Sequence, residues 1–239
     1  MSEQARPRIA VLVFPGSNDD RDAALAFERL GAEPVLVWHA ETGLPEVGAV
    51  ALPGGFSYGD YLRCGAIARF APVMRAVRAF ADEGGLVLGI CNGFQVLCEA
   101  GLLPGVLRPN TSLSFVCRDV GLTVERADTA FTSRCHDGQR LVIPVKHGEG
   151  CYIPPPDLPS AQIVLRYAED HNPNGSVGAI AGVISVAGNV MGLMPHPEHA
   201  VDSLLGSADG GYVLGSVVDA VRSHAENPRQ LGTLANRRA

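Results

Sequence analysis

A cysteine between two glycines, in the segment GICNG at residues 89–93, is the strongest chemical feature of the chain. The apolar run before it is typical of a buried strand, and the residues from Asn92 to Gly101 have the spacing of a helix and its C-terminal glycine. This order predicts a nucleophile elbow, because small neighbours let strand and helix approach closely around a strained turn. The helix dipole would favour the thiolate of Cys91. A buried structural cysteine also fits the stretch.

His196 is the candidate general base for this cysteine. The proline that follows it favours an extended backbone, on which residues two positions apart face the same side. Glu198 is then expected beside the imidazole, where it accepts the ring N–H and fixes the tautomer. One interpretation is therefore a triad of Cys91, His196 and Glu198. A rigid turn with a solvated glutamate is the other.

Backbone N–H groups for a developing oxyanion are expected at two places. Asn92 follows Cys91 directly, so its N–H is available beside the sulfur. The second donor is expected at Gly55, because Gly54 and Gly55 follow a strand and lack the Cβ that would keep a substrate at a distance. An ordinary strand-end turn explains the two glycines equally well.

Two polar, glycine-bearing loops are candidates for holding a small polar substrate. They are residues 147–150 (HGEG) and residues 172–176 (NPNGS), and simple turns would explain both. The candidate substrate-binding residues are Gly54, Phe56, Gln95, His147, Gly148, Asn174, Gly175 and Ser176.

Strands and helices alternate along the first half of the chain, and they must position these residues. Strands are expected at residues 8–14, 33–39, 49–52 and 86–90, and helices from Ser17 or Asn18 to Leu30, from 71 to 83 and from 92 onward. This order predicts a flavodoxin-like α/β fold, a doubly wound and mostly parallel sheet with helices on both faces. Active sites of such sheets lie at the carboxyl ends of the strands, where both Cys91 and Gly55 are expected.

The pattern changes after Pro104. Short strand-like runs without intervening helices are expected at residues 113–124, 141–145, 162–167, 178–186 and 190–194. They predict an antiparallel strand region added to the same domain. A final helix is expected at residues 212–224, followed by a polar tail from about residue 226. We find no repeat and no linker, so we expect a single domain over residues 1–239.

Composition excludes several classes of protein. Hydrophobic residues make up 46% and charged residues 18%, which favours a large core, and the net charge of −6 argues against nucleic-acid binding. No run of 18 apolar residues and no signal-peptide pattern occur, which predicts no membrane span and a cytoplasmic location. The six cysteines lack zinc-like spacing, so free thiols and no metal are expected. The one lysine, Lys146, precedes a histidine, so there is no P-loop and we expect no cofactor on this chain.

The motifs resemble a known family. GICNGFQ at 89–95 and PHPE at 195–198 look like a class I glutamine amidotransferase, and within that class like the glutaminase subunits of phosphoribosylformylglycinamidine synthase. Further matching segments extend over nearly the whole chain: PGSN at 15–18, PGGFSYGDYLRCG at 53–65, GLLPG at 101–105, HGEG at 147–150, NGS at 174–176 and LLGSADG at 204–210. The residues NGFQ after the cysteine and the FSYGD run are the most discriminating parts.

The resemblance implies that Cys91 is the nucleophile, His196 the base and Glu198 its partner, with oxyanion donors near Gly55 and Asn92. Glutamine would be hydrolysed to glutamate and ammonia. The ammonia would pass to a partner synthetase subunit, which converts formylglycinamide ribonucleotide to formylglycinamidine ribonucleotide in purine biosynthesis. ATP and magnesium are expected on that synthetase, and a small accessory subunit is expected in the same complex.

Two other functions are considered beside this interpretation, and the chain departs from the resembled family at two positions. A stand-alone cysteine hydrolase of the related superfamily would carry an acidic residue near the end of the first strand, where this chain has Pro15-Gly16-Ser17. A non-catalytic regulatory subunit would not need an intact Cys, His and Glu set. Asp19 stands where a cysteine is common in the resembled family, and His199 where an arginine is usual. We expect both departures to affect surface or partner contacts and not the triad.

Overall fold

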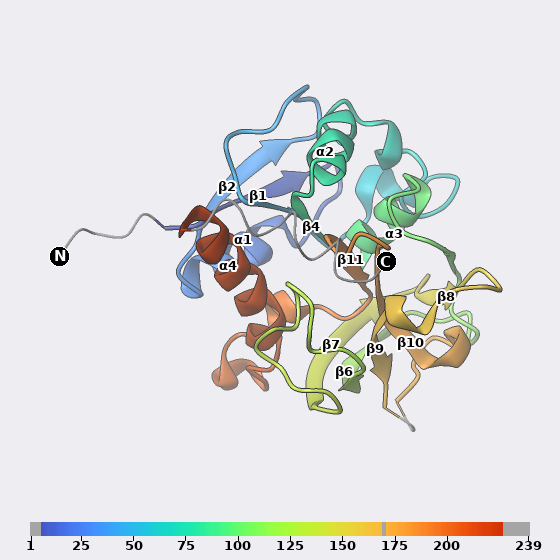
Figure 1. Cartoon of the computed structure of the whole chain (residues 1–239). Coiled ribbons are helices and arrows are strands. Elements are labelled where there is room, and N and C mark those ends of the chain that lie inside the picture. The colour runs from blue at the N-terminus through green and yellow to red at the C-terminus, as the bar shows by residue number, and fades with distance from the viewer. Residues whose placement is uncertain (1–5, 169–170, 227–239) are drawn as a thin grey trace.

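The first half of the chain builds a parallel sheet, as the sequence predicts. The computed structural model describes residues 6–168 and 171–226, and the polar tail predicted from about residue 226 lies outside these residues. The parallel strands are β1 (Arg8–Val13), β2 (Glu33–Trp38), β3 (Ala49–Leu52), β4 (Leu86–Ile90) and β11 (Val190–Leu193). They lie in the order β2-β1-β3-β4-β11 (Figure 1). This order confirms the doubly wound α/β fold.

Four antiparallel strands extend this sheet to nine strands. After β11 come β10 (Ile180–Ile184), β9 (Ile163–Tyr167), β6 (Val116–Val124) and β7 (Arg140–His147). The strand predicted at residues 190–194 is not simply part of the antiparallel region. It is β11, fully buried and parallel to β4, with Leu193 opposite Ile90. It therefore joins the two halves of the sheet.

A small second sheet was not predicted. It pairs β5 (Val106–Arg108) with β8 (Cys151–Ile153) in antiparallel register. Strands of three residues contain too little alternation to be recognised from sequence. The strand predicted from residue 113 begins later, at Val116, because Leu113 has a φ of 53° and is exposed.

Helices cover both faces of the parallel strands (Figure 1). One face holds α1 (Asp20–Arg29) and α4 (Gly210–Glu226), which contact one another, and the other holds α2 (Val73–Asp82) and α3 (Asn92–Glu99). Helix α1 begins later than predicted. The hydroxyl of Ser17 accepts the N–H of Phe14 at 3.1 Å, and Ser17 forms a bridge with Gly55. These contacts keep Ser17 and Asn18 out of the helix, so that Asp19 is its N-cap.

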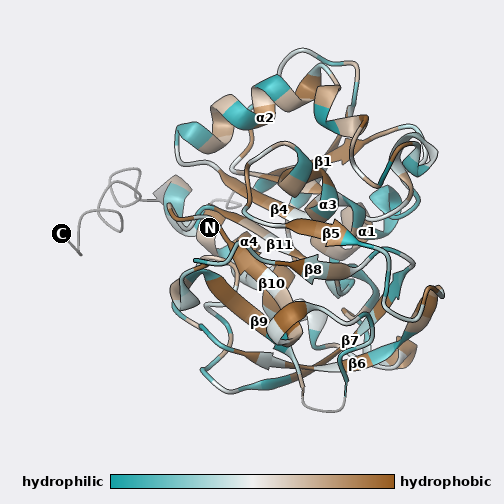
Figure 2. Cartoon of the chain, turned by 90° about the vertical axis from the view of Figure 1, so that its right-hand side faces the viewer, coloured by the Kyte–Doolittle hydropathy of each residue, from teal (hydrophilic) through white to brown (hydrophobic). Residues whose placement is uncertain are grey.

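The core lies between the sheet and the helices. Figure 2 shows the central strands as mostly hydrophobic and the helices as mixed. Every residue of β3 and β4 is buried, as expected for central strands of a parallel sheet covered on both faces. Within residues 6–168 and 171–226, no helix has the length and apolar character that a membrane span requires.

Three strand ends meet at one point. Because β11 runs beside β4, the segment after Leu193 emerges next to the residue that follows Ile90. Strand β7 is four places away from β11 in the sheet, yet it returns to the same point. The N–H of His196 donates to the carbonyl of Pro144 at 2.8 Å. The sheet thus curls until its last strand reaches the segments that follow β4 and β11.

Candidate active site

The elbow predicted around Cys91 is present in the structure. Cys91 lies between β4 and α3 with φ 48° and ψ −102°, a strained conformation for a residue with a side chain. A Cβ on Gly93 would collide with the carbonyl oxygen of Leu52, and one on Gly89 would lie 2.5 Å from the Cδ1 of Leu97. The two glycines therefore permit the close crossing of strand and helix that produces the turn.

The helix begins immediately after the cysteine. Asn92 is the first residue of α3, so no intrahelical carbonyl accepts its N–H, and the positive end of the helix faces Cys91. The side chain of Asn92 fixes the surroundings: its Oδ1 accepts the N–H of Ser57 at 3.1 Å, and its Nδ2 donates to Gln95 at 2.9 Å. The loop after β3 is thus tied to the elbow.

His196 and Glu198 form a buried pair. Nδ1 of His196 lies 2.6 Å from Oε1 of Glu198, and both residues are buried. Burial lowers the pKa of His196, but Glu198 and Cys91 outweigh it and raise that pKa to about 10. Nε2 of His196 has no hydrogen-bond partner within the part of the chain that is described. The carboxylate thus orients the ring by one nitrogen and leaves the other for proton transfer.

Asp19 lies against this pair, so the expectation that the two departures avoid the triad is wrong. Oδ2 of Asp19 is 3.6 Å from Nδ1 of His196, and Oδ1 is 3.3 Å from Nε2 of His199 and forms an ion pair with Lys146. Burial raises the pKa of Asp19, but His199, His196 and Lys146 together hold it far below its usual range. The contacts join residues 127 and 180 positions apart, which the sequence could not indicate.

These groups are also close enough to share a metal ion. Asp19, His196, Glu198 and His199 offer ligand atoms that lie within 4.8 Å of one another. The ammonium of Lys146 already pairs with Asp19, however, and Nδ1 of His196 faces Glu198 at hydrogen-bond distance. Oδ1 of Asp19, Nδ1 of His196 and Oε1 of Glu198 are therefore engaged with protein partners, and we interpret the group as an ion-pair network. The absence of a metal stays a prediction.

A cavity of about 170 Å³ lies in front of Cys91. Of the residues predicted from the sequence, Gly55, Phe56, Gln95, His147 and Gly148 line it. Five further residues line it, of which the sequence indicated only Glu149, as a member of the loop at 147–150: Asp60, Cys64, Phe115, Lys146 and Glu149. Asp60, Cys64 and Glu149 lie inside the motifs that carried the resemblance, so the motifs could have indicated them as site residues. Phe115 lies outside these motifs.

Gly54 lies behind the cavity and not in its lining. A Cβ on Gly54 would collide with Oδ2 of Asp19 and lie 2.5 Å from the Cε1 of His196. Because Gly54 has no side chain, there is room for the imidazole of His196 and for the carboxylate of Asp19. Gly55 has a φ of 133°, and a Cβ there would lie 2.5 Å from the backbone nitrogen of Asn18.

His147 is held in one neutral form. Its Nδ1 lies 3.2 Å from Oδ1 of Asn110 and donates to it, and its Nε2 lies 3.4 Å from Nδ2 of Asn174 and accepts from it. Burial and the charge of His196 lower the pKa of His147 to about 4. Asn174, Gly175 and Ser176 stand behind this imidazole, outside the lining of the cavity. Their substrate-binding role stays a prediction.

A second cysteine lines the cavity. Burial, with Asp60 and Glu149 beside it, raises the pKa of the Cys64 thiol far above its usual range. Cys64 therefore stays a thiol at neutral pH. The pKa of Asp60 is raised by burial and by the charge of Glu149. The cavity thus has an acidic side, which adjoins the start of α3, where Nδ2 of Asn92 donates to Asp60 at 3.3 Å.

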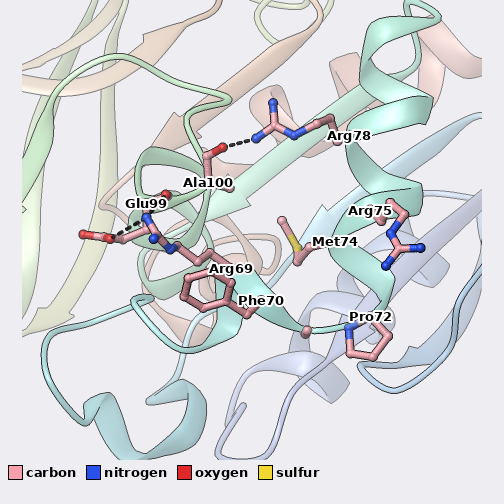
Figure 3. A pocket seen from close by; sticks show the side chains of 9 residues that line it. Arg69, Phe70, Pro72, Met74, Arg75, Arg78, Glu99 and Ala100 are labelled. Atoms are coloured by element: carbon pink, nitrogen blue, oxygen red, sulfur yellow. Dashed lines mark hydrogen bonds and ion pairs between the residues drawn. The ribbon is translucent and has the colours of Figure 1, made fainter.

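A larger hollow of about 400 Å³ lies at the other end of α3 (Figure 3). Arg69 donates to the carbonyl of Glu99 at 3.1 Å, and Arg78 donates to the carbonyl of Ala100. The guanidinium groups complement the negative end of the helix and hold it in place. None of the predicted site residues lines this hollow, so it supports the elbow helix and is not the candidate active site.

Comparisons with known proteins agree with this geometry. Residues 6–210 match the family model of CobB/CobQ-like glutamine amidotransferase domains. Phosphoribosylformylglycinamidine synthase subunit PurQ from Rubrobacter xylanophilus is 60% identical over 216 residues, 88% of this chain and 97% of that protein. The same subunit from Mycolicibacterium paratuberculosis is 56% identical over 220 residues, 90% of this chain and 97% of that protein.

A solved structure extends the comparison to three dimensions. PurLQS from Thermotoga maritima superposes with a TM-score of 0.84 and 46% identity, covering 90% of this chain and 98% of that chain. The family model and this superposition thus show a glutamine amidotransferase. Within that class, the chain belongs to the family of phosphoribosylformylglycinamidine synthase subunit PurQ.

Proposed function

We propose that Cys91, His196 and Glu198 hydrolyse glutamine, and that the ammonia serves the synthetase of phosphoribosylformylglycinamidine synthase. One observation carries this proposal. The strained Cys91 directly precedes a helix and lines a small cavity, and it interacts with a buried His196 whose Nδ1 lies 2.6 Å from Glu198. A structural cysteine would need neither the strain nor the paired imidazole.

The first half of the reaction forms a thioester. The thiolate of Cys91 attacks the side-chain amide carbon of glutamine, and the backbone N–H groups of Asn92 and Gly55 stabilise the oxyanion. Nε2 of His196, as imidazolium, gives its proton to the departing nitrogen, so that ammonia leaves. The raised pKa of His196 supports its role as proton donor in this step.

The second half releases glutamate. Neutral His196 takes a proton from water, whose oxygen attacks the thioester carbon, and the sulfur leaves as the thiolate. Glu198 keeps the ring oriented and stabilises the imidazolium formed in this step. The three residues then return to their starting protonation states.

The lining of the cavity is proposed to hold the substrate. Phe56, Gln95 and Gly148 face the space in front of Cys91, and Gln95 also fixes the loop at 147–150 by donating to the carbonyl of Glu149 at 2.7 Å. His147 also lines the cavity, and we assign Asn174, Gly175, Ser176 and Gly54 to supporting positions around it. The acidic side chains Asp60 and Glu149 suit the α-ammonium group of glutamine.

The partner reaction lies outside this chain. ATP and magnesium are proposed to bind the synthetase subunit, which converts formylglycinamide ribonucleotide in purine biosynthesis, and a small accessory subunit completes the complex. The structural relative from Thermotoga maritima is PurLQS, which supports an assembly of this kind. We also propose that the chain works in the cytoplasm. Its match to named synthase subunits over most of both lengths counts against a stand-alone hydrolase.

Ammonia release tests this function. Release from glutamine is measured with this chain alone, and then with the synthetase, ATP and the ribonucleotide substrate, each beside Cys91→Ala. We expect the partner to raise the release and Cys91→Ala to reduce it by at least about a thousandfold. Release by Cys91→Ala at the wild-type level, or no release under any condition, would reject the triad and favour a non-catalytic subunit.

A further inference from the structure

Two carboxylates, and not one, face the same nitrogen of the candidate catalytic histidine. Glu198 accepts from Nδ1 of His196 at 2.6 Å, and Oδ2 of Asp19 is 3.6 Å from the same atom. The carboxylates come from opposite ends of the chain, Asp19 before α1 and Glu198 after β11. At 3.6 Å, Asp19 does not take the ring proton, so its effect on the imidazole is that of a charge.

Asp19 is held as an ionised group. Its side chain is 4% exposed, and its Oδ1 pairs with the ammonium of Lys146 and with Nε2 of His199 at 3.3 Å. Lys146 is the one lysine of the whole sequence. Gly54 keeps the approach open, because any side chain there would collide with both Asp19 and His196. Burial, the ion pair with Lys146, the contact with His199 and the missing side chain of Gly54 thus all support the contact between Asp19 and His196.

We propose that Asp19 is a second, electrostatic carboxylate for His196, which stabilises the imidazolium while Glu198 fixes its direction. Asp19 is a positioning residue, because it acts through His196 and does not line the cavity. This role rests on the proposed function of His196 as the base. Lys146 and His199 moderate the charge of Asp19, so the network sets how strongly the imidazolium is favoured.

Charged and titratable groups from several elements lie close to His196. Negative charge comes from Glu198 and Asp19, and Cys91 also interacts with the ring. Positive or titratable groups are Lys146 and His147 on β7, and His199, whose ring centroid lies 5.5 Å from that of His196. An experiment must therefore change one of these charges at a time, in proteins that all carry the same residue at position 91.

The test measures the pKa of His196 directly, by nuclear magnetic resonance of the ring nitrogens in a Cys91→Ala background. Asp19→Asn keeps the shape and removes the charge, so we expect the pKa of His196 to fall by about one unit or more. Lys146→Gln leaves Asp19 uncompensated, so we expect that pKa to rise. Asp219→Asn is the matched control, because Asp219 pairs with Arg134 at 2.6 Å on the surface, and we expect no shift.

Opposite shifts from the two halves of one ion pair would support the proposal, because loss of packing would not produce them. It is overturned if Asp19→Asn leaves the pKa of His196 unchanged, or if both variants shift it in the same direction. A change of the wild-type ring signals on addition of a chelator would reveal a metal and also overturn it. The pKa of His196 is measured without glutamine and in a variant that lacks the Cys91 thiol, so this result does not depend on whether the proposed function holds.

With the cysteine restored, the same substitutions are followed in the pH profile of ammonia release. The alkaline limb reports the imidazolium that protonates the leaving nitrogen. We expect Asp19→Asn to move this limb to lower pH, with a larger loss of kcat than of affinity for glutamine. A loss that is equal at all pH values would contradict an electrostatic role for Asp19.

Discussion

His147 shows how one buried side chain combines local geometry with pH. Nδ1 donates to Asn110 and Nε2 accepts from Asn174, and only the neutral ring can make both hydrogen bonds. The pKa of His147 is lowered to about 4 from an ordinary value of 6.5. The folded state therefore resists a proton that the unfolded chain binds readily.

The stability of the protein should consequently fall in acid. Below about pH 6.5 the unfolded chain takes up a proton at His147 and the folded chain does not until about pH 4, so folding loses free energy across this window. At pH 5 the loss from this one group is about 2 kcal/mol relative to pH 8.

The measurement is urea unfolding of the wild type and of His147→Gln at both pH values. We expect the variant to be less stable at pH 8 but to lose about 2 kcal/mol less than the wild type on going to pH 5. The same pH dependence in both proteins would show that His147 does not remain neutral in the folded state.

Residue types and spacing indicated the central side chains but not their neighbours. Cys91, His196 and Glu198 could be selected because an elbow and an X-Pro segment are local patterns. Asp19 could not, because its partners Lys146 and His199 are 127 and 180 residues away in the chain. A carboxylate one residue before a helix is typical of a cap, and only the folded chain gives it another role.

At the scale of elements, the position of Cys91 depends on a very close crossing of strand and helix. Gly93 lies against the carbonyl of Leu52, the last residue of β3, and its N–H donates to the carbonyl of Pro53 at 3.1 Å. Helix α3 therefore rests on the backbone of the neighbouring strand. The same contact brings Asn92 near the Gly54-Gly55 segment.

Gly93→Ala tests this crossing. The added methyl group would meet backbone atoms, which cannot move aside cheaply, so we expect a loss of about 2–3 kcal/mol in the free energy of unfolding and a larger loss of activity. Gly43→Ala is the matched control, because no atom lies within 4 Å of a Cβ at that exposed position, and we expect a change within about 0.5 kcal/mol. Equal stabilities of the two variants would contradict the need for glycine at residue 93.

Strong periodicity is what made the elements predictable. The parallel strands and the helices around the elbow have long buried faces, and the structure confirms them to within a few residues. The position of β11 could not be predicted, because pairing with β4 is a contact across about 100 residues of chain that no local pattern encodes. The two three-residue strands fall below the length at which alternation is visible.

At the scale of the whole molecule, the sheet is both the core and the positioning device. Its parallel half places Cys91 and His196 at adjacent strand ends, and its antiparallel half curls back to deliver Lys146 and His147 from β7. A flat sheet would have left these residues far apart. That residues 1–239 form a single domain stays a proposal.

The central claim is that Cys91, and no other cysteine, reacts with glutamine. Cys64 makes the test sharp, since it lines the same cavity but has a pKa far above neutrality. A diazoketone analogue of glutamine is incubated with the wild type, and the labelled peptide is identified by mass spectrometry. The account predicts one label, on Cys91, that excess glutamine prevents and that is absent from Cys91→Ala. A label on Cys64, or labelling that persists in Cys91→Ala, would contradict it.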